Sequence, residues 1–578
     1  MPTTHVAGVE PGQRPLNGPQ TTGRDYRNLS DAEFGVRREN DVRIPTRDGT
    51  VLLADVYRPD TDRPVPALVA AAPYPRQIQD LGAPTGIIEA GISDFWVPRG
   101  YAHVIVNLRG MCGSEGTWTF FDSQERLDLH DIVEWVAEQP WCDGQVGMIG
   151  ISYYAMAMLA AAVERPPHLA AIFPFHATIS GFEFANHNGL YSSGFMDSWL
   201  SALALVAPRN RAFRSPLVSL VRRVLALPRV HRRFATFNGE AALAGLEKVQ
   251  HLPHAEHPWD DLLRACGQEH PVRDAWWDDR ELVHRLAAID IPVYLGTEWT
   301  NVPMHLPGTL AAWEQLADKP NVRLALLGDH GLPWPWESMH VEALAWFDHW
   351  LKGRDTGTLD GPPIRYVLPG ADGWRTAEEW PPTADLTELA LQADGRLAPD
   401  HGADTAGDRS YDSAYGRLSW TTTPLSEDLD VLGHGELALT AASTATDTGW
   451  IVLLEDLAPD GTATPVTQGW LRAALREVDE AASAPGRPIL PVRRAAPIPI
   501  GEPVDYRIPL VPTARRFAAG HRVRLTVTSD DTVPGSRPML GFTHTPVATT
   551  ATNTVHATSR LLLPVAPSIT TPENQERS

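Results

Sequence analysis

The sequence predicts an α/β domain followed by an all-β sandwich, and three observations support this fold class. Two apolar runs, PALVAAAPY at 66–74 and YAHVIVNLRG at 101–110, lack polar alternation, which is typical of strands buried on both faces of a parallel sheet. Residues 123–141 then place apolar side chains at roughly helical spacing before another apolar run at 146–149. After residue 361, short runs rich in threonine and valine alternate with Gly, Pro and Asp turns, the pattern of a sandwich.

The same patterns divide the chain of 578 residues into segments. A hairpin is expected around Asp48-Gly49, because this dipeptide favours a tight two-residue turn. The region that begins near Phe182 is rich in helix formers and has no convincing strand before residue 289, which predicts a helical cap. We expect an N-terminal arm at 1–40, the first part of the α/β core at 41–181, the helical cap at 182–288, the second part of the core at 289–361, the sandwich at 362–565 and a tail at 566–578.

The composition restricts the partners and the compartment of the chain. Lys and Arg number 49 against 71 Asp and Glu, and the net charge of -22 disfavours nucleic acid and an anionic membrane as partners by repulsion. The 3 cysteines are too few for a disulfide framework or a thiolate metal site, which suits a reducing cytoplasm. The first residues lack the pattern of a signal peptide, and no later run of about 18 apolar residues could span a bilayer. We therefore expect a cytoplasmic protein without nucleic acid or membrane partners.

One serine stands in a sequence context that favours catalysis. Ser152 follows the apolar residues 146–149 and directly precedes a helix-forming run rich in alanine. A serine at a sharp turn from strand to helix projects its hydroxyl above the sheet, and the amide after it faces the position of an oxyanion. The usual G-x-S-x-G pattern is incomplete, because Tyr154 replaces the second glycine. The short motif alone therefore leaves a nucleophile and an ordinary turn residue both open.

Longer stretches around this turn form a recognisable set. They are APYPR at 72–76, NLRGMCGSEG at 107–116, WVAEQPWCDGQVGMIGISYY at 135–154, HPVRDAWWDDR at 270–280 and PVYLGTEWTN at 292–301. With them, the sequence resembles the cocaine esterase and X-prolyl dipeptidyl-peptidase family of α/β-hydrolases. The resemblance covers most of the chain and implies an α/β-hydrolase core with a helical cap insertion and a C-terminal jelly-roll β-sandwich. In that family the turn commonly reads G-x-S-Y-x-G, which Tyr153 matches, whereas Ala155 replaces the last glycine.

The resemblance also implies roles for individual residues. Ser152 would be the nucleophile, and the amide of Tyr153 together with the hydroxyl of Tyr74 would form the oxyanion hole. His330, after the strand-like LALLGD, would be the general base, although the family often has a longer G-P-W-x-H sequence at this place. The chain order of serine followed by a late histidine agrees with this assignment.

The acid of the expected triad is the one residue that departs from the family. The family has W-x-D after text like PVYLG, whereas this chain has Trp299-Thr300-Asn301. An amide can orient an imidazole, but it does not stabilise an imidazolium by charge, and the same change in a serine protease cost about 10⁴ in turnover. Three interpretations stay open: another carboxylate such as Glu298 reaches the histidine, Asn301 suffices for a slow or activated substrate, or hydrolysis has been lost.

The sequence therefore carries three functional hypotheses. The first is a serine hydrolase that cleaves small-molecule esters or amides through an acyl-enzyme on Ser152. The second is an acyltransferase or condensing enzyme that uses the same serine with a triad weakened at Asn301. The third is a catalytically silent binding protein that keeps the pocket. No cofactor or metal is expected, the partner would be a small ester, amide or acyl donor, and a homodimer is left open.

Overall fold

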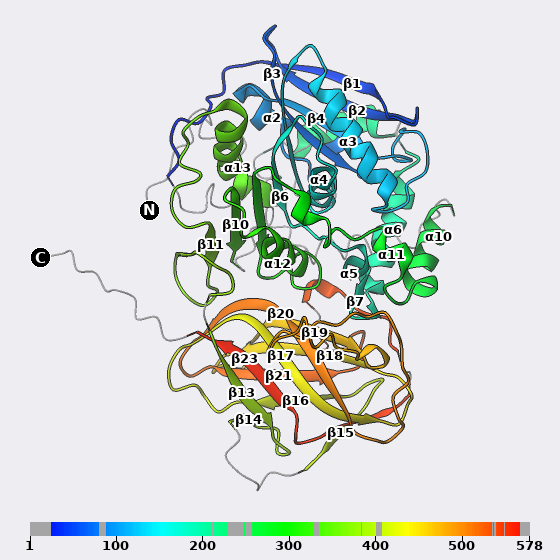
Figure 1. Ribbon diagram of the computed structural model, residues 1–578, viewed down its shortest axis with the longest axis vertical. Coiled ribbons are helices and arrows are strands. Elements are labelled where there is room, and N and C mark those ends of the chain that lie inside the picture. Colours follow the sequence, from blue (N-terminus) through cyan, green and yellow to red (C-terminus); the bar gives the residue numbers. More distant parts are fainter. Residues whose placement is uncertain are drawn as a thin grey trace, which may run out of the picture. The chain divides into compact units, whose positions relative to one another are not determined.

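The computed structural model describes most of the chain and divides it into two compact units (Figure 1). The described residues are 25–79, 88–209, 212–225, 257–328, 335–382, 384–399, 407–533, 539–547 and 550–566, with the single residues 227, 230, 248 and 536. The first unit takes its residues from Met1–Ala185, Ser193–His270 and Asp274–Tyr366, and the second from Asn186–Ser192, Pro271–Arg273 and Val367–Ser578. The segment boundaries expected from the sequence stay predictions.

The first unit is built on a mostly parallel sheet. Its strands lie in the order β1-β2-β4-β3-β5-β6-β9-β10-β11-β12, and the last strand, β12 (Trp374–Ala377), comes from residues counted with the second unit. The hairpin of β1 and β2 and the pairing of β2 with β4 are antiparallel, and the pairs from β4 to β11 are parallel. The strands are β1 (Val36–Pro45), β2 (Val51–Pro59), β3 (Val65–Ala72), β4 (Ala102–Asn107), β5 (Cys142–Ile151), β6 (Leu169–Phe175), β9 (Val293–Glu298), β10 (Val322–Leu327) and β11 (Ile364–Val367).

Helices cover both faces of this sheet. The longer helices of the first unit are α3 (Ser123–Ala137), α4 (Tyr153–Val163), α6 (Ser193–Val206), α7 (Pro216–Leu225), α12 (His305–Leu316) and α13 (Pro335–Lys352). Of these, α3, α4, α12 and α13 contact strands of the sheet. Figure 1 shows α13 on the opposite side of the strands from α3 and α4. The short ones are α1 (Arg76–Gln79), α2 (Ser93–Trp96), η1 (Val97–Arg99), α5 (Gly181–Ala185), η2 (Ala212–Arg214), α10 (Trp259–Arg264), η3 (Ala265–Glu269), α11 (Ala275–Asp278) and η4 (Leu286–Ala288). The α/β core and the helical insertion expected from the sequence are thus confirmed.

Local chemistry explains the elements that lead to the serine turn. Helix α3 begins where the side chain of Asp122 accepts a hydrogen bond from the backbone N–H of Glu125 at 3.0 Å, an N-cap that satisfies one free amide of the first turn. Strand β5 passes close to α13, because a Cβ at Gly147 would lie 2.8 Å from the ring of Phe347. Helix α4 is rich in alanine and almost wholly buried, which fits its position against β5 and β6.

The second unit is the expected β-sandwich. Its strands lie in the order β14-β13-β23-β17-β20-β19-β18-β21-β16, and β22 pairs with β15 and β17. Buried and half-buried residues alternate along β21, where Val523, Leu525 and Val527 face the core. The strands are β13 (Asp385–Leu391), β14 (Leu397–Ala398), β15 (Arg409–Asp412), β16 (Arg417–Thr421), β17 (Leu429–Ser443), β18 (Gly449–Leu457), β19 (Ala463–Arg472), β20 (Val504–Phe517), β21 (Arg522–Thr528), β22 (Thr552–Val555) and β23 (Arg560–Val565).

Short elements complete this second unit. They are β7 (Asn186–His187), β8 (Leu190–Tyr191), β12 (Trp374–Ala377), η5 (Ala473–Leu475) and η6 (Met539–Gly541). Strands β7 and β8 pair as a small antiparallel hairpin, in a region where the sequence predicted a helical cap without strands. Throughout the described part of the chain, the helices are too short or too polar to cross a bilayer.

Candidate active site

Ser152 occupies a strained turn between β5 and α4. Its φ of 59° and ψ of -116° lie in a region that residues with a side chain rarely adopt, and such strain persists where the surrounding structure enforces it. The backbone N–H of Ser152 donates to the carbonyl oxygen of Phe175 at the end of β6 at 3.0 Å, and its carbonyl oxygen accepts from the N–H of Met156 at 3.0 Å. The turn is therefore held from both sides, and it presents the serine at the carboxyl end of the sheet.

The incomplete glycine pattern has a local steric explanation. Gly150 has a φ of 149°, and a Cβ there would lie 2.1 Å from the Cβ of Tyr154. Only glycine fits this position, because the side chain of Tyr154 already occupies the space. The first glycine of the motif is thus required by the turn, whereas the place of the second holds a buried tyrosine.

The structure brings Tyr74 to Ser152. A hydrogen bond joins the two side chains, and the Nε1–H of Trp199 donates to the hydroxyl oxygen of Tyr74 at 3.2 Å. Burial raises the pKa of Tyr74 well above its usual value of 10, and the neighbouring Glu89 adds to this shift. The phenol therefore keeps its proton at neutral pH and remains a hydrogen-bond donor for a developing oxyanion.

The side chain of Tyr153 is fixed by buried contacts away from Ser152. Its hydroxyl donates to the carboxyl group of Glu125 at 2.8 Å and accepts from the Nε1–H of Trp118 at 3.2 Å. Its ring stacks on Phe121 at a centroid distance of 4.4 Å. These contacts fix the side chain, and the amide of Tyr153 directly follows Ser152 as the expected oxyanion hole requires.

An imidazole that the sequence analysis did not select contacts the serine. His305 is the first residue of α12, and its Nε2 lies 3.1 Å from Oγ of Ser152. The side chain of His305 is 3% exposed, and its Nδ1 is buried without a hydrogen-bond partner among the described residues. Burial lowers the pKa of His305 well below the usual 6.5, and the nearby imidazole of His176 lowers the pKa further. His305 is therefore neutral at physiological pH.

A second histidine lies behind the first. His176 follows β6 with a φ of 58°, and its ring stacks on the ring of His305 at a centroid distance of 5.7 Å. The Nδ1 of His176 lies 3.0 Å from Oγ1 of Thr297. Burial lowers the pKa of His176 to about 3, so this ring is also neutral. The two imidazoles form a buried pair at the ends of β6 and α12.

Asn301 contacts both of these histidines, and its expected place in a triad with His330 stays a prediction. Its Oδ1 accepts a hydrogen bond from the backbone N–H of His305 at 3.2 Å, and its Nδ2 is 3.5 Å from Nδ1 of His176. The first bond satisfies one of the backbone N–H groups of the first turn of α12, which have no acceptor within the helix. The Asn301 amide therefore anchors the segment that carries His305.

Two sequence-predicted candidates remain, His330 and Glu298. His330 lies outside the described residues, so its expected role as the base stays a prediction. Burial raises the pKa of Glu298, at the end of β9, to about 7, and a hydrogen bond with Thr300 opposes this shift. In the described part of the chain, no hydrogen bond or ion pair joins a carboxylate to His305.

Sequence reasoning missed His305 and His176 because neither stands in the expected pattern. The chain offered one clue, since the text Asn301-Val-Pro-Met-His305 places a histidine four residues after the unexpected asparagine. That spacing is one helical turn, but the start of α12 at His305 becomes visible only in the fold.

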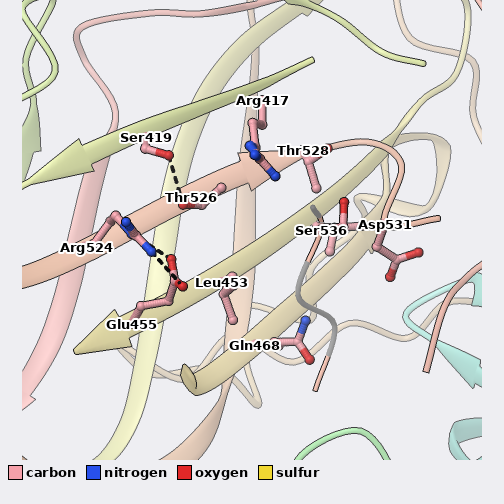
Figure 2. Close-up of a pocket in the computed structure, with 11 residues that line it drawn as sticks. Arg417, Ser419, Leu453, Glu455, Gln468, Arg524, Thr526, Thr528, Asp531 and Ser536 are labelled. Carbon is pink, nitrogen blue, oxygen red and sulfur yellow. Dashed lines mark hydrogen bonds and ion pairs between the residues drawn. The ribbon is translucent and has the colours of Figure 1, made fainter. Parts of the chain in front are cut away.

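The second unit contains a pocket of a different character. Its cavity volume is about 240 Å³, and it lies over strands β16, β18, β19 and β21 (Figure 2). An ion pair of Arg524 with Glu455 and a hydrogen bond of 2.9 Å between Ser419 and Thr526 occupy one side. No histidine lines this pocket among the described residues, so it lacks the serine–imidazole pair of the first unit.

Comparisons with known proteins agree with this geometry. The X-Pro dipeptidyl-peptidase (S15 family) profile matches residues 48–336, half of the chain, and the X-Pro dipeptidyl-peptidase C-terminal non-catalytic domain matches residues 357–561. The chain belongs to the S15 family. It is accordingly a serine hydrolase that acts on ester or amide bonds.

Individual relatives extend this result over both units. The cocaine esterase of Rhodococcus sp. (strain MB1 Bresler) is 26% identical over 558 residues, which cover 85% of this chain and 90% of that protein. A CocE/NonD family hydrolase from Staphylococcus aureus has a similar fold, with a TM-score of 0.75, 22% identity, and coverage of 95% of this chain and 100% of that chain. An α-amino acid ester hydrolase superposes with a TM-score of 0.65 at 18% identity, over 94% of this chain and 99% of that chain. The resemblance expected from the sequence is thus confirmed.

Proposed function

We propose that this protein hydrolyses small esters or amides through an acyl-enzyme on Ser152. The observation that carries the proposal is the strained turn of Ser152, whose Oγ contacts an imidazole nitrogen at 3.1 Å and the buried phenol of Tyr74. A nucleophile, a base and an oxyanion donor within hydrogen-bond reach of one another are the parts that acyl transfer requires.

The expected reaction uses these parts in order. Oγ of Ser152 attacks the carbonyl carbon while an imidazole accepts the hydroxyl proton, and the carbonyl oxygen becomes an oxyanion held by the hydroxyl of Tyr74 and the amide of Tyr153. The tetrahedral intermediate collapses, the imidazolium protonates the leaving group, and an acyl ester remains on Ser152. Water then attacks the acyl ester in the same way, and the carboxylic acid product leaves while Ser152 regains its proton.

The surroundings of Ser152 favour an apolar acyl group. Trp199 binds Tyr74 and packs in an aromatic cluster with Trp118, Phe184 and Phe195. Ring-lined surfaces provide large apolar area and few polar groups, which suits an aromatic or aliphatic acyl chain better than a charged one. The names of the related cocaine esterase and α-amino acid ester hydrolase are consistent with ester substrates.

Intact-mass labelling tests this function directly. Wild type treated with a fluorophosphonate is expected to gain one adduct on Ser152, and Ser152→Ala is expected to gain none. The same two proteins are assayed on p-nitrophenyl esters of increasing acyl length and on an Xaa-Pro p-nitroanilide. A wild type that neither labels nor turns over any of these substrates would leave the binding-protein hypothesis instead.

A second candidate function is acyl transfer to an acceptor other than water. The specific observation in its favour is the absence of a carboxylate at His305 in the described residues, since deacylation by water is then less well supported. An amine acceptor added to the ester assay distinguishes the two functions. Acyl transfer predicts an amide product that grows with acceptor concentration while little acid is released.

A further inference from the structure

We propose that His305 is the general base that activates Ser152 in this chain, an inference that rests on the acyl-enzyme function proposed above. The sequence analysis expected His330 from its place after a late strand. Among the described residues, which do not include His330, Nε2 of His305 lies 3.1 Å from Oγ of Ser152, within the reach that a general base needs.

The position of His305 is built into the packing of α12. A Cβ at Gly308 would lie 2.5 Å from the Cα of Thr178, so the glycine allows the helix to approach the chain directly after β6. Oγ1 of Thr309 donates to the carbonyl oxygen of Ala177 at 3.1 Å. Together with the bond from the N–H of His305 to Asn301, these contacts hold the first turn of α12 over the end of β6. Ser152 is tied to the same strand through Phe175, so both reacting groups share one support.

The proposed role requires one tautomer of the ring. For Nε2 to accept the proton of Ser152, the neutral ring must carry its hydrogen on Nδ1. That Nδ1 is buried without a partner among the described residues, whereas the acid of a usual triad would accept this hydrogen. In the described part of the chain, backbone and stacking contacts hold His305, and no carboxylate bonds its ring.

The groups around the ring make its protonated form costly. His176 stacks on it from the end of β6, and Phe184 of α5 lies at a centroid distance of 6.4 Å. Tyr74, after β3, faces the same serine, and Glu298 ends β9, but neither adds to the lowered pKa of His305, which comes from burial and from His176. The ring also stands at the N-terminus of α12, where the helix dipole disfavours a cation. His305 thus remains a free base at a pH where an ordinary catalytic histidine is already protonated.

The proton balance of the step is complete without further groups. Nε2 takes the Ser152 proton as the bond from Oγ to the carbonyl carbon forms and the carbonyl electron pair moves to oxygen. The same Nε2–H then protonates the leaving group as the bond from carbon to that group breaks. In deacylation, Nε2 takes a proton from water and returns it to Oγ.

The test compares His305→Gln with His330→Gln in fluorophosphonate labelling and in turnover of an activated ester. Glutamine keeps most of the volume of histidine and a polar end, and circular dichroism checks that both variants fold. We expect His305→Gln to lower kcat/KM by about 10²–10⁴-fold, the usual contribution of a general base, and to lose more than His330→Gln. The surface residue His168, paired with Glu134, gives a matched control, and His168→Gln is expected to leave activity unchanged.

The pH profile separates a catalytic role from a structural one. With His305 as the base, kcat/KM of wild type is expected to fall less than twofold between pH 7.5 and pH 5.5, roughly one unit below the usual histidine pKa of about 6.5. The proposal is overturned if His305→Gln stays within threefold of wild type, or if His330→Gln loses more. In either case Ser152→Ala still decides the proposed function separately, because an active wild type with an inactive Ser152→Ala keeps the acyl-enzyme and rejects only His305 as its base.

Discussion

Each unit of this protein contains a buried pair of histidines, and the two pairs contact different groups: a serine in the first unit and a carboxylate in the second. In the first unit, His305 contacts Ser152 and stacks on His176, with no carboxylate bonded to His305 among the described residues. In the second unit, Nδ1 of His544 lies 2.8 Å from Asp531, and its Nε2 lies 2.6 Å from Nδ1 of His187. In the described residues, the pair of the first unit therefore contacts the candidate nucleophile Ser152, and the pair of the second unit contacts the carboxylate of Asp531.

The difference shows what a catalytic triad consists of physically. The second pair has the carboxylate–imidazole geometry of a triad, yet His187 stacks on Trp470 at 4.4 Å and the group belongs to the packing of the sandwich. Among the described residues, the first pair has no bonded carboxylate, but His305 contacts a serine that stands on a strained turn beside the hydroxyl of Tyr74. A carboxylate–imidazole pair without a nearby serine is therefore not by itself a catalytic site.

The largest effect is expected from removing the nucleophile. Ser152→Ala should lower kcat/KM by about 10⁴-fold or more, because in serine hydrolases loss of this oxygen ends covalent catalysis. The free energy of unfolding should change little, since the turn is held by its backbone. Ester turnover measures the activity, and urea unfolding measures the stability. Activity near the wild-type level in Ser152→Ala would contradict Ser152 as the nucleophile.

A large effect is also expected at the oxyanion donor. Tyr74→Phe removes the hydroxyl that bonds Ser152 and should lower kcat by about 10²–10³-fold with little change in KM. Tyr411 in the second unit provides the matched control, since its buried hydroxyl bonds Oγ of Ser529 at 2.7 Å. Tyr411→Phe should leave kcat unchanged, and equal losses in both variants would show a general effect of buried phenols instead.

The Asn301→Asp variant would give the histidine pair of the first unit a carboxylate, as the pair of the second unit already has. Asn301→Asp places a negative charge beside His305 and His176, which favours the imidazolium and raises its pKa. The base then becomes stronger, and turnover at pH 8 should rise by about tenfold. Because the base must be a neutral imidazole to accept the serine proton, a higher pKa of this ring should move the acid limb of the pH profile to higher pH. A profile identical to that of wild type would mean that Asn301 does not act on the base.

The smallest effect on activity is expected in the second unit. His544→Ala leaves the buried carboxylate of Asp531 without its imidazole and should destabilise the sandwich by about 3 kcal/mol. Turnover per folded molecule should stay unchanged. Chemical denaturation measures the stability, and active-site titration of Ser152 gives the turnover per folded molecule. A lower kcat in a variant whose Ser152 labels fully would show that His544 affects catalysis as well as stability.

Much of the fold and part of the site follow from sequence patterns. The buried strands β3, β4 and β5 and the α3 helix were predicted from local periodicity, and the structure confirms them. The hairpin expected at Asp48-Gly49 is also confirmed, but residues 46–50 form a longer connection than the expected two-residue turn. Local patterns suffice here because strand burial and helix amphipathicity depend on neighbours close in the sequence. Ser152 and Tyr74 were selected through the strand-to-helix turn and the family resemblance, and the structure brings them together.

The amino-acid sequence by itself determined the α/β core, the sandwich, the family and the serine, since each is written in short contiguous patterns. Only the tertiary structure decided which imidazole meets Ser152, because His305 is 153 positions away and its place depends on the close approach of α12 at Gly308 to the chain after β6. Spacing along the chain carries no information about such a contact. Distance in the folded protein is set by packing, and packing joined a serine and a histidine that no local pattern connects.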